Sequence, residues 1–321
     1  MLKTAESVSP KHPDKVCDRI ADAILDECLR QDKDTRSAIE VLGGHGSVVV
    51  IGELQTKGYV NIRSVVHSVL GDDSYGVLTN IARQSPEIAQ GVDIGGAGDQ
   101  GVMIGYACNE NEEFIPQEYY LARKLNRFLY KQNPQDGKTQ ITINKYGEIE
   151  ALVASWANTK RSDLHSLVLD WLNKNSLKEP ATLYLNPAGD WSISGFDADT
   201  GLSGRKIVID NYGPRVPIGG GSFSGKDGTK VDRSGAYKAR QTAVKLLKEH
   251  NAKEVFVRVG YAIGEKYPVE LSAIIDGEYK SLIDLKEEFT PENIINTLKL
   301  QDSKFEKTAE YGHFGNGFTW G

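Results

Sequence analysis

The chain has 321 residues, of which 39% are hydrophobic and 26% are charged, and its formal net charge is −6. This length predicts two or three domains, and the ordinary composition indicates a soluble globular protein. The charge gives no reason to expect a nucleic-acid partner, and no stretch approaches the roughly 20 apolar residues of a membrane helix. The N-terminus lacks an apolar signal segment. The three cysteines, Cys17, Cys28 and Cys108, lack CxxC spacing and are expected as reduced thiols of a cytoplasmic protein.

An amphipathic helix is predicted near the N-terminus, over residues 13–29. Its apolar stripe consists of Val16, Ile20, Ala23, Ile24 and Cys28. The charged residues Asp18, Arg19, Asp22, Asp26 and Glu27 lie largely off this stripe. Pro13 suits the first helical position, so His12 and Asp14 are expected at the helix N-terminus.

The rest of the chain alternates strands and helices. Predicted strands, recognised by runs of valine and isoleucine between turn residues, cover residues 37–42, 47–53, 102–107, 139–144, 148–156, 182–185, 206–210, 254–263 and 269–275. Predicted helices cover residues 61–70, 80–83, 118–131, 164–173, 232–250 and 291–298. This order favours an α+β fold of three similar α/β units, with helices covering one side of each sheet. The expected domains are residues 1–93, 94–197 and 198–321, and their strands are free to interleave.

Two glycine-rich motifs match nucleotide-binding fingerprints without the context that those fingerprints need. Residues 96–101 fit G-x-G-x-x-G, but no buried strand precedes them and a strand is expected directly after them, which argues against a dinucleotide site. Residues 220–226 nearly fit a Walker A loop, but Asp227 stands where Ser or Thr must bind magnesium. The preceding predicted strand also ends near Asp210, about ten residues too early. A P-loop kinase or ATPase is therefore the weaker alternative.

Several polar clusters together predict a polyphosphate ligand with a divalent metal. The loop 219–227 combines glycines, hydroxyls and Lys226, and backbone N–H groups left bare by glycine can surround phosphate oxygens. Further cations and carboxylates follow on the segments 12–15, 136–138 and 199–206. Cations suit the phosphates, and carboxylates suit their metal.

With these segments the sequence resembles the S-adenosylmethionine synthetase (methionine adenosyltransferase) family. The matching segments follow the family's order along nearly the whole chain, at residues 6–8, 12–15, 84–86, 90–93, 96–101, 201–206, 219–227, 230–234 and 311–315. The resemblance implies a pseudo-threefold arrangement of the three units. It also implies a homodimer with active sites between the two chains, and whether two dimers join into a tetramer stays open.

The resemblance also implies a reaction. The sulfur of methionine would attack C5′ of ATP and expel the triphosphate, which is then cleaved to pyrophosphate and phosphate. Sulfur is already a good neutral nucleophile, so no strong base is needed. The difficulty is the charge that gathers on the departing triphosphate, and fixed cations, metal ions and a helix N-terminus stabilise such charge.

The family pattern assigns a role to each matching residue. His12 would stabilise the leaving oxygen, Asp14 and Asp232 would bind Mg²⁺, and Glu40 would bind K⁺. The expected catalytic residues are His12, Lys138, Arg205 and Lys226. The expected ATP-binding residues are His12, Asp136, Lys138, Asp190, Trp191, Asp199, Arg205, Lys206, Ser222 and Lys226. The expected methionine-binding residues are Glu53, Gln90, Asp99, Asp199 and Lys230.

Several of these residues also have a plain structural interpretation. His12, Asp14 and Asp232 suit helix N-termini whatever they bind. Trp191 is expected to stack on adenine, with core packing as the alternative. Glu40 sits on an apolar strand, where an exposed position without a ligand is the alternative.

The chain is short for the family. Only Ile94 and Gly95 separate residues 90–93 from Gly96, whereas commoner members carry a longer mobile loop there that gates the site. We therefore expect a minimal lid or none. A nonenzymatic nucleotide-binding subunit is a further alternative, but it should have lost the metal and phosphate ligands that this chain keeps.

Overall fold

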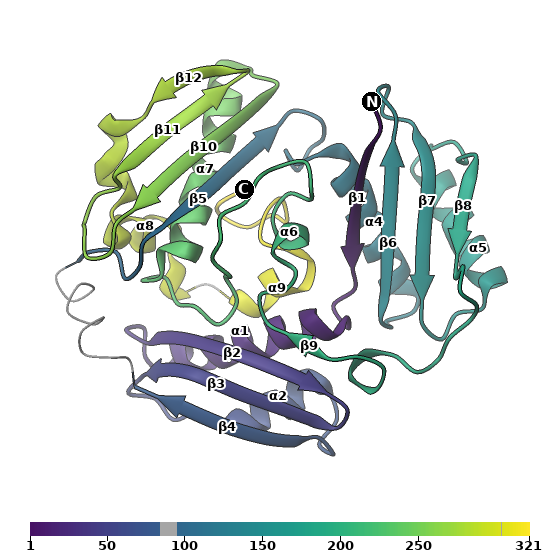
Figure 1. Cartoon of the computed structure of the whole chain (residues 1–321), viewed down its shortest axis with the longest axis horizontal. Coiled ribbons are helices and arrows are strands. Elements are labelled where there is room, and N and C mark those ends of the chain that lie inside the picture. The colour runs from purple at the N-terminus through teal and green to yellow at the C-terminus, as the bar shows by residue number, and fades with distance from the viewer. Residues whose placement is uncertain (84–94, 303) are drawn as a thin grey trace.

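A computed structural model describes residues 1–83, 95–302 and 304–321 of the chain. Three four-stranded sheets surround a centre of loops and short helices (Figure 1). The strands are β1 (Lys3–Val8), β2 (Arg36–Gly44), β3 (Ser47–Gln55), β4 (Gly76–Ala82), β5 (Gly101–Cys108), β6 (Gly137–Ile143), β7 (Ile149–Trp156), β8 (Thr182–Leu185), β9 (Gly201–Leu202), β10 (Glu254–Tyr261), β11 (Glu270–Ile275) and β12 (Glu278–Ser281). The sheet orders are β1-β6-β7-β8, β12-β11-β10-β5 and β4-β3-β2-β9. The expected mixture of strands and helices in several sheets is confirmed.

The helices pack on these sheets. They are α1 (Pro13–Gln31), α2 (Ile62–Leu70), α4 (Gln117–Gln132), α5 (Arg161–Lys174), α6 (Ile207–Asp210), α7 (Val231–His250), α8 (Pro291–Leu298) and α9 (Thr308–Tyr311). Helix α4 packs on β1 and β6, α7 packs on β5 and β10, and α1 packs on β2. Within the described residues, no helix has both the length and the apolar character needed to cross a membrane.

Each sheet contains one strand from a distant part of the chain. Strand β1 pairs with β6, so Val8 lies opposite Lys138. Strand β5 pairs with β10, and the short β9 joins β2, with Leu202 opposite Leu42. These strand pairings bring remote segments together. The chain after β1 therefore runs close to Lys138, and the chain after β9 lies beside the start of α1.

Two hydrophobic cores lie under the sheets. The smaller core joins α1 to the inner face of β2 and β3 through Ile20, Ile24, Ile39, Val41 and Val50, all fully buried. The larger core joins the other two sheets and includes the buried Trp156, Trp171 and Tyr106. The stripe residues Val16, Ile20, Ile24 and Cys28 therefore face the core as expected, and burying them anchors the helix, whereas Ala23 is half-buried and lines a cavity.

Two sequence predictions of secondary structure are wrong. A helix is expected over residues 80–83, but β4 runs through Ala82 and pairs in parallel with β3, with Leu78 opposite Val49. A strand is expected over residues 206–210, but Ile207–Asp210 forms the helix α6. Periodicity cannot separate the two states in such short apolar runs, so tertiary pairing decides. Strands β1, β9 and β12 are not among the predicted elements.

Glycine permits the close contact of α7 with its sheet, and this contact is testable. A Cβ on Gly105 of β5 would lie 2.1 Å from the carbonyl of Ala239. We expect Gly105→Ala to push α7 away and to lower the free energy of unfolding by roughly 1–3 kcal/mol. Urea denaturation measures this change. The control is Gly76→Ala on β4, where the nearest atom would lie 3.7 Å away; equal stability of the two variants would contradict the expectation.

Candidate active site

His12 caps the N-terminus of α1. Its backbone is extended, with φ −60° and ψ 135°, and its Nδ1 accepts a hydrogen bond of 3.2 Å from the backbone N–H of Asp14. Burial, with help from the nearby Lys206 and Lys138, lowers the pKa of His12 to about 3. The imidazole is therefore neutral at physiological pH. Because Nδ1 accepts, the proton of this neutral ring sits on Nε2, which has no hydrogen-bond acceptor among the described residues.

Asp14 gathers two cations at the same helix end. One carboxylate oxygen accepts a hydrogen bond of 2.9 Å from the backbone N–H of Leu202 and forms an ion pair with Arg205 Nε at 3.0 Å. The other oxygen accepts from Lys206 Nζ at 2.5 Å. Burial opposes ionisation, but the bonds from Lys206 and Leu202 outweigh it and lower the pKa of Asp14. Asp14 is thus an ionised carboxylate beneath two cations.

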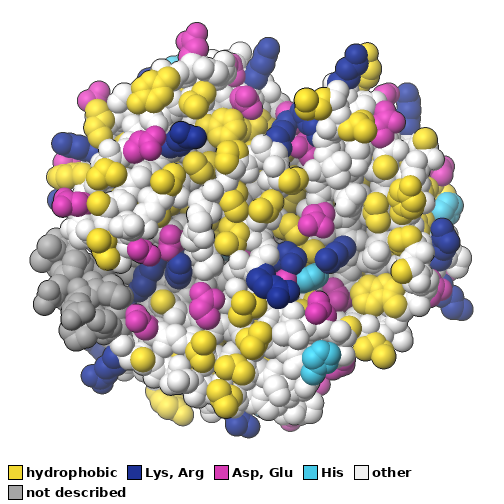
Figure 2. All heavy atoms as spheres, viewed as in Figure 1, with side chains coloured by type: hydrophobic (Ala, Val, Ile, Leu, Met, Phe, Trp, Pro, Cys, Tyr) yellow, Lys and Arg dark blue, Asp and Glu magenta, His cyan; other side chains and the backbone are white. Residues whose placement is uncertain are grey.

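Three more predicted residues lie around His12. Lys138 on β6 is exposed and Asp199 is exposed, and both lie close enough to shift the pKa of His12. Asp136 is buried and accepts a bond of 3.1 Å from the backbone N–H of Gly195, and burial raises the pKa of its carboxyl. The structure therefore brings residues from several segments together; they are His12, Asp14, Asp136, Lys138, Asp199, Arg205 and Lys206, called here the α1 cluster. Figure 2 shows Lys and Arg side chains, carboxylates and a histidine gathered near the middle of this face.

A second group surrounds the loop 219–227 at the start of α7. Lys226 Nζ donates to Asp232 at 2.7 Å, and Lys230 Nζ donates to Asp227 at 2.8 Å. The loop packs closely against the Lys226–Asp232 pair, because a Cβ on Gly221 would lie 2.0 Å from an oxygen of Asp232. These four charged residues, Lys226, Asp227, Lys230 and Asp232, are called here the α7 cluster. Asp227, which breaks the Walker pattern, serves as an acceptor for Lys230 and for the backbone N–H of Ser37 at 2.7 Å.

Glu40 lies between the two clusters. Its carboxylate accepts a hydrogen bond from the hydroxyl of Ser203, and burial raises its pKa although Lys226 opposes this effect. The loops that carry the clusters also touch, since a Cβ on Gly204 would meet Ser222 at 2.7 Å. Glu40 is thus a half-buried oxygen donor beside both cation groups.

The remaining predicted residues join neither cluster through a hydrogen bond or ion pair in the described part of the chain. Asp190 accepts from the backbone N–H of Arg161 at 2.9 Å, and the half-buried Trp191 follows it. Glu53 on β3 and the exposed Asp99 also stand apart. Gln90 and the shortened segment for which a reduced lid is expected lie outside the described residues, apart from Gly95.

Sequence reasoning missed a set of buried charges behind the clusters. The sequence places Asp18 and Asp22 off the buried stripe of α1, yet these residues are only 1% and 0% exposed. They pair with Lys15 and Arg233, and Asp210 of α6 also binds Lys15 at 2.6 Å. The repeat of aspartates at every fourth position was the available signal, since such spacing marks one helix face.

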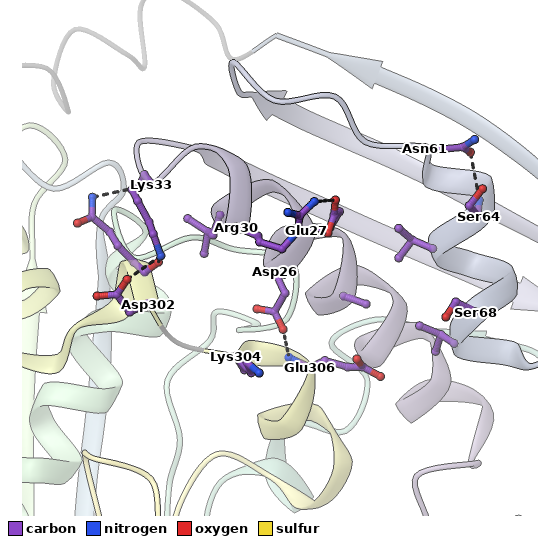
Figure 3. A pocket seen from close by; sticks show the side chains of 15 residues that line it. Asp26, Glu27, Arg30, Lys33, Asn61, Ser64, Ser68, Asp302, Lys304 and Glu306 are labelled. Atoms are coloured by element: carbon purple, nitrogen blue, oxygen red, sulfur yellow. Dashed lines mark hydrogen bonds and ion pairs between the residues drawn. The ribbon is translucent and has the colours of Figure 1, made fainter.

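A sizeable cavity lies elsewhere. It measures about 580 Å³ and opens between α1, α2 and the C-terminal residues 301–302 and 304–306 (Figure 3). Its lining includes none of the predicted site residues, and its charges largely pair with each other, as Glu27 does with Arg30 and Lys33 does with Asp302. The polar clusters, rather than the cavity, define the candidate active site.

Comparison with known proteins covers almost the whole chain. Family models described as the N-terminal, central and C-terminal domains of S-adenosylmethionine synthetase match residues 1–90, 94–191 and 193–321. The S-adenosylmethionine synthase of Pseudothermotoga lettingae is 39% identical over 378 residues, which cover 99% of this chain and 96% of the relative. Those of Nitratiruptor sp. and Petrotoga mobilis are 36% and 38% identical, covering 99% and 98% of this chain and 95% and 94% of the relatives. The alignments span more residues than this chain contains, so these relatives carry segments that it lacks.

The neutral state of His12 is a testable property. With its pKa lowered to about 3, His12 stays unprotonated in the folded protein, whereas the unfolded chain takes up the proton below its usual value of 6.5. The contribution of His12 to stability is therefore present above pH 6.5 and is lost as the pH falls toward 3. We expect the imidazole signals of His12, followed by NMR and assigned with His12→Asn, to remain constant from pH 5 to 8. A titration midpoint within that window would contradict the assignment.

Proposed function

This chain belongs to the S-adenosylmethionine synthetase family, and we propose that it transfers the adenosyl group of ATP to the sulfur of methionine. Its relatives over almost the full length are S-adenosylmethionine synthases. The observation that carries the proposal for this chain is the pairing of cations with carboxylates at two helix N-termini, Lys206 with Asp14 and Lys226 with Asp232. Such a site can receive a triphosphate together with its metal ions.

His12 acts on the leaving oxygen. The methionine sulfur forms a bond to C5′ of ATP, the C5′–O5′ bond breaks, and its electron pair stays on the triphosphate. The Nε2–H of the neutral His12 donates a hydrogen bond to O5′ as charge develops there, which favours the transition state over the ground state. No proton needs to be removed from the sulfur, so the site requires no general base.

The cations of both clusters hold the triphosphate. Lys138, Arg205, Lys206 and Lys226 bind its oxygens, Ser222 adds a hydroxyl, and Arg205 assists the later cleavage to pyrophosphate and phosphate. The side chains of Lys206 and Lys226 are only 17% and 18% exposed, so solvent screens their charges less than it would at an open surface. As the substrate binds, these cations exchange a carboxylate partner for a phosphate partner.

The carboxylates released by this exchange suit metal ions. Asp14 and Asp232 are hard oxygen donors, and Mg²⁺ is commonly held by one or two carboxylates together with substrate phosphates. Bound Mg²⁺ would neutralise charge on the departing triphosphate. Glu40 and the hydroxyl of Ser203 supply oxygen donors for K⁺.

The other predicted residues bind the organic parts of the substrates. Asp136, Asp190 and Trp191 surround the adenosine, and Trp191 stacks on the adenine. Lys230 binds the methionine carboxylate. The residues that bind the rest of methionine or join it to the nucleotide are Glu53, Gln90, Asp99 and Asp199. The buried, free cysteines suit a reducing compartment, which supports a cytoplasmic protein.

The active protein is a homodimer with sites between its chains. The outer face of the sheet β4-β3-β2-β9 exposes Leu42, Ile51 and Leu78 by 43%, 46% and 60%. The register places Glu40 opposite Ile51, and Glu53 lies two residues further along β3, so both predicted ligands share this apolar face. A second copy that covers the face would bury the apolar side chains and close the site. The three units are related by a pseudo-threefold arrangement, and the association of two dimers into a tetramer stays open.

One assay tests the reaction. We expect S-adenosylmethionine, pyrophosphate and phosphate from ATP, methionine, Mg²⁺ and K⁺. We expect Lys226→Ala to lower turnover by roughly 100-fold, the scale of losing one electrostatic contact to the transition state, with little change in stability. The control is Lys57→Ala, which removes a lysine whose side chain is 83% exposed. Phosphate release that does not depend on methionine would support an ATPase instead, and an equal loss of activity and thermal stability would contradict the role of Lys226.

Mixing two inactive variants tests the shared site. His12→Ala damages the α1 cluster, and Lys226→Ala damages the α7 cluster. If each site combines clusters from both chains, a mixed dimer contains one site without either mutation. Unfolding and refolding an equal mixture should then restore about a quarter of wild-type activity, since half of the dimers are mixed and each has one intact site. No recovery, with dimers confirmed by analytical ultracentrifugation, would place the whole site within one chain.

A further inference from the structure

Four aspartates recur at every fourth position of α1. They are Asp14, Asp18, Asp22 and Asp26, and this spacing places them along one face of the helix. The face is not turned to solvent, because the side chains of Asp14, Asp18 and Asp22 are at most 1% exposed. Burying several carboxylates along one helix is costly unless each is paired, so the burial of these aspartates requires a structural explanation.

Each aspartate accepts backbone N–H groups from a remote segment. Asp14 accepts from Leu202 at 2.9 Å and Asp18 from Gly204 at 2.8 Å, so both hold the loop that carries Arg205 and Lys206. Asp22 accepts from Gly225 at 2.9 Å and so holds the loop that carries Lys226. Asp26 accepts from Phe305 at 2.7 Å and from Glu306 at 3.0 Å, next to the cavity of Figure 3. The helix thus connects both phosphate-binding loops and the C-terminal segment.

Arg233 extends the contact made by Asp22. Its Nη2 donates to both oxygens of Asp22, at 2.8 and 2.7 Å, and its Nη1 donates to the carbonyl oxygen of Lys226 at 2.9 Å. The side chains of both residues are 0% exposed, so neither can touch a substrate. Together they hold the loop at two neighbouring residues, through the N–H of Gly225 and the carbonyl of Lys226.

The opposite side of the loop is held by β2. Gly225 has a φ of +82°, and a Cβ at this position would lie 2.0 Å from the carbonyl oxygen of Ile39. Lys226 forms an isolated bridge with Ala38. The loop is therefore fixed between a strand and the Asp22–Arg233 pair, and a shift of that pair changes where the Lys226 ammonium lies.

We propose that Asp22 and Arg233 are positioning residues of the adenosyl-transfer reaction, which fix the backbone of Gly225 and Lys226 so that Lys226 meets the triphosphate. The proposal rests on the function proposed above. Buried ion pairs contribute little net stability compared with well-packed apolar groups, whereas their directional bonds define geometry. The pair therefore affects turnover by more than its effect on folding explains.

Asp22→Asn tests this proposal, with Asp26→Asn as the matched control. Both changes remove one carboxylate from the same face of α1, but Asp26 holds residues 305–306 and no phosphate-binding loop. The amide introduced by Asp22→Asn can still accept from Gly225, yet it leaves the buried Arg233 without its counter-charge, so the loop moves. We expect kcat to fall roughly 10- to 100-fold, the scale of a displacement of about 1 Å, with a smaller change in KM for methionine. Asp26→Asn should stay within about twofold of the wild type.

Two further readouts separate positioning from folding. Arg233→Lys keeps the positive charge but loses the planar donors that reach both Asp22 and the Lys226 carbonyl, so it should also lower kcat while urea unfolding shows a folded protein. Amide hydrogen exchange should speed up at Gly225 in Asp22→Asn and stay unchanged there in Asp26→Asn. The affinity for tripolyphosphate with Mg²⁺, measured by calorimetry, should fall in Asp22→Asn and not in Asp26→Asn.

The outcomes distinguish this proposal from the proposed function. If the wild type forms no S-adenosylmethionine, the function is wrong, while exchange at Gly225 and tripolyphosphate affinity still decide whether the pair positions the loop. The proposal is overturned if the loss of kcat in Asp22→Asn matches its loss of folded protein. It is equally overturned if Asp26→Asn loses as much activity, or if Gly225 keeps its protection when Asp22 is changed.

Discussion

The arrangement of charged groups in this protein depends on one helix, which places carboxylates beside the cations of the candidate site. A site for a triphosphate needs several cations within a few ångströms of one another, and two unit charges at 4 Å repel by about 4 kcal/mol at an effective dielectric constant near 20. Helix α1 offsets this repulsion with Asp14, Asp18 and Asp22, which face Arg205, Lys206, Lys15 and Arg233. Because the same carboxylates also accept backbone N–H groups, charge balance and loop position come from one set of atoms.

The ion pairs of α1 become more buried from the N-terminus of the helix inward, and their suitability for binding a ligand falls accordingly. Asp14 at the N-terminus pairs with Arg205, whose side chain is 50% exposed and can exchange its partner for a phosphate. One turn further, Asp18 pairs with the fully buried Lys15, and the next turn brings Asp22 and Arg233, neither with any exposed surface. A buried pair cannot exchange partners, because removing one charge leaves the other unpaired in a dry environment. The outer turn is therefore suited to binding and the inner turns to holding the loops.

The sequence predicts the elements whose signals are local. The apolar stripe and Pro13 predict α1, and the same periodicity predicts α7 and most of the central strands. It does not predict β1 or β9, whose partners lie more than a hundred residues away, or α6, where a run of four residues has no resolvable period. The motifs place His12 and Asp14 correctly at a helix end. They give no role to Asp22, because its partners, Gly225 and Arg233, become neighbours only in the folded chain.

The protonation state of His12 follows from the same concentration of positive charge. A protonated imidazole would add one more cation beside Lys206 and Lys138, and burial would deprive it of water, so the neutral ring is favoured. A neutral donor is also what the proposed reaction needs at the leaving oxygen. The departing triphosphate is a stabilised anion that can leave without being protonated, so a hydrogen bond from Nε2 suffices while the cations take up the charge. In the proposed reaction, the cations thus stabilise the charge on the phosphates, and the neutral N–H of His12 donates a hydrogen bond to O5′. The N-terminus of α1 holds these groups side by side.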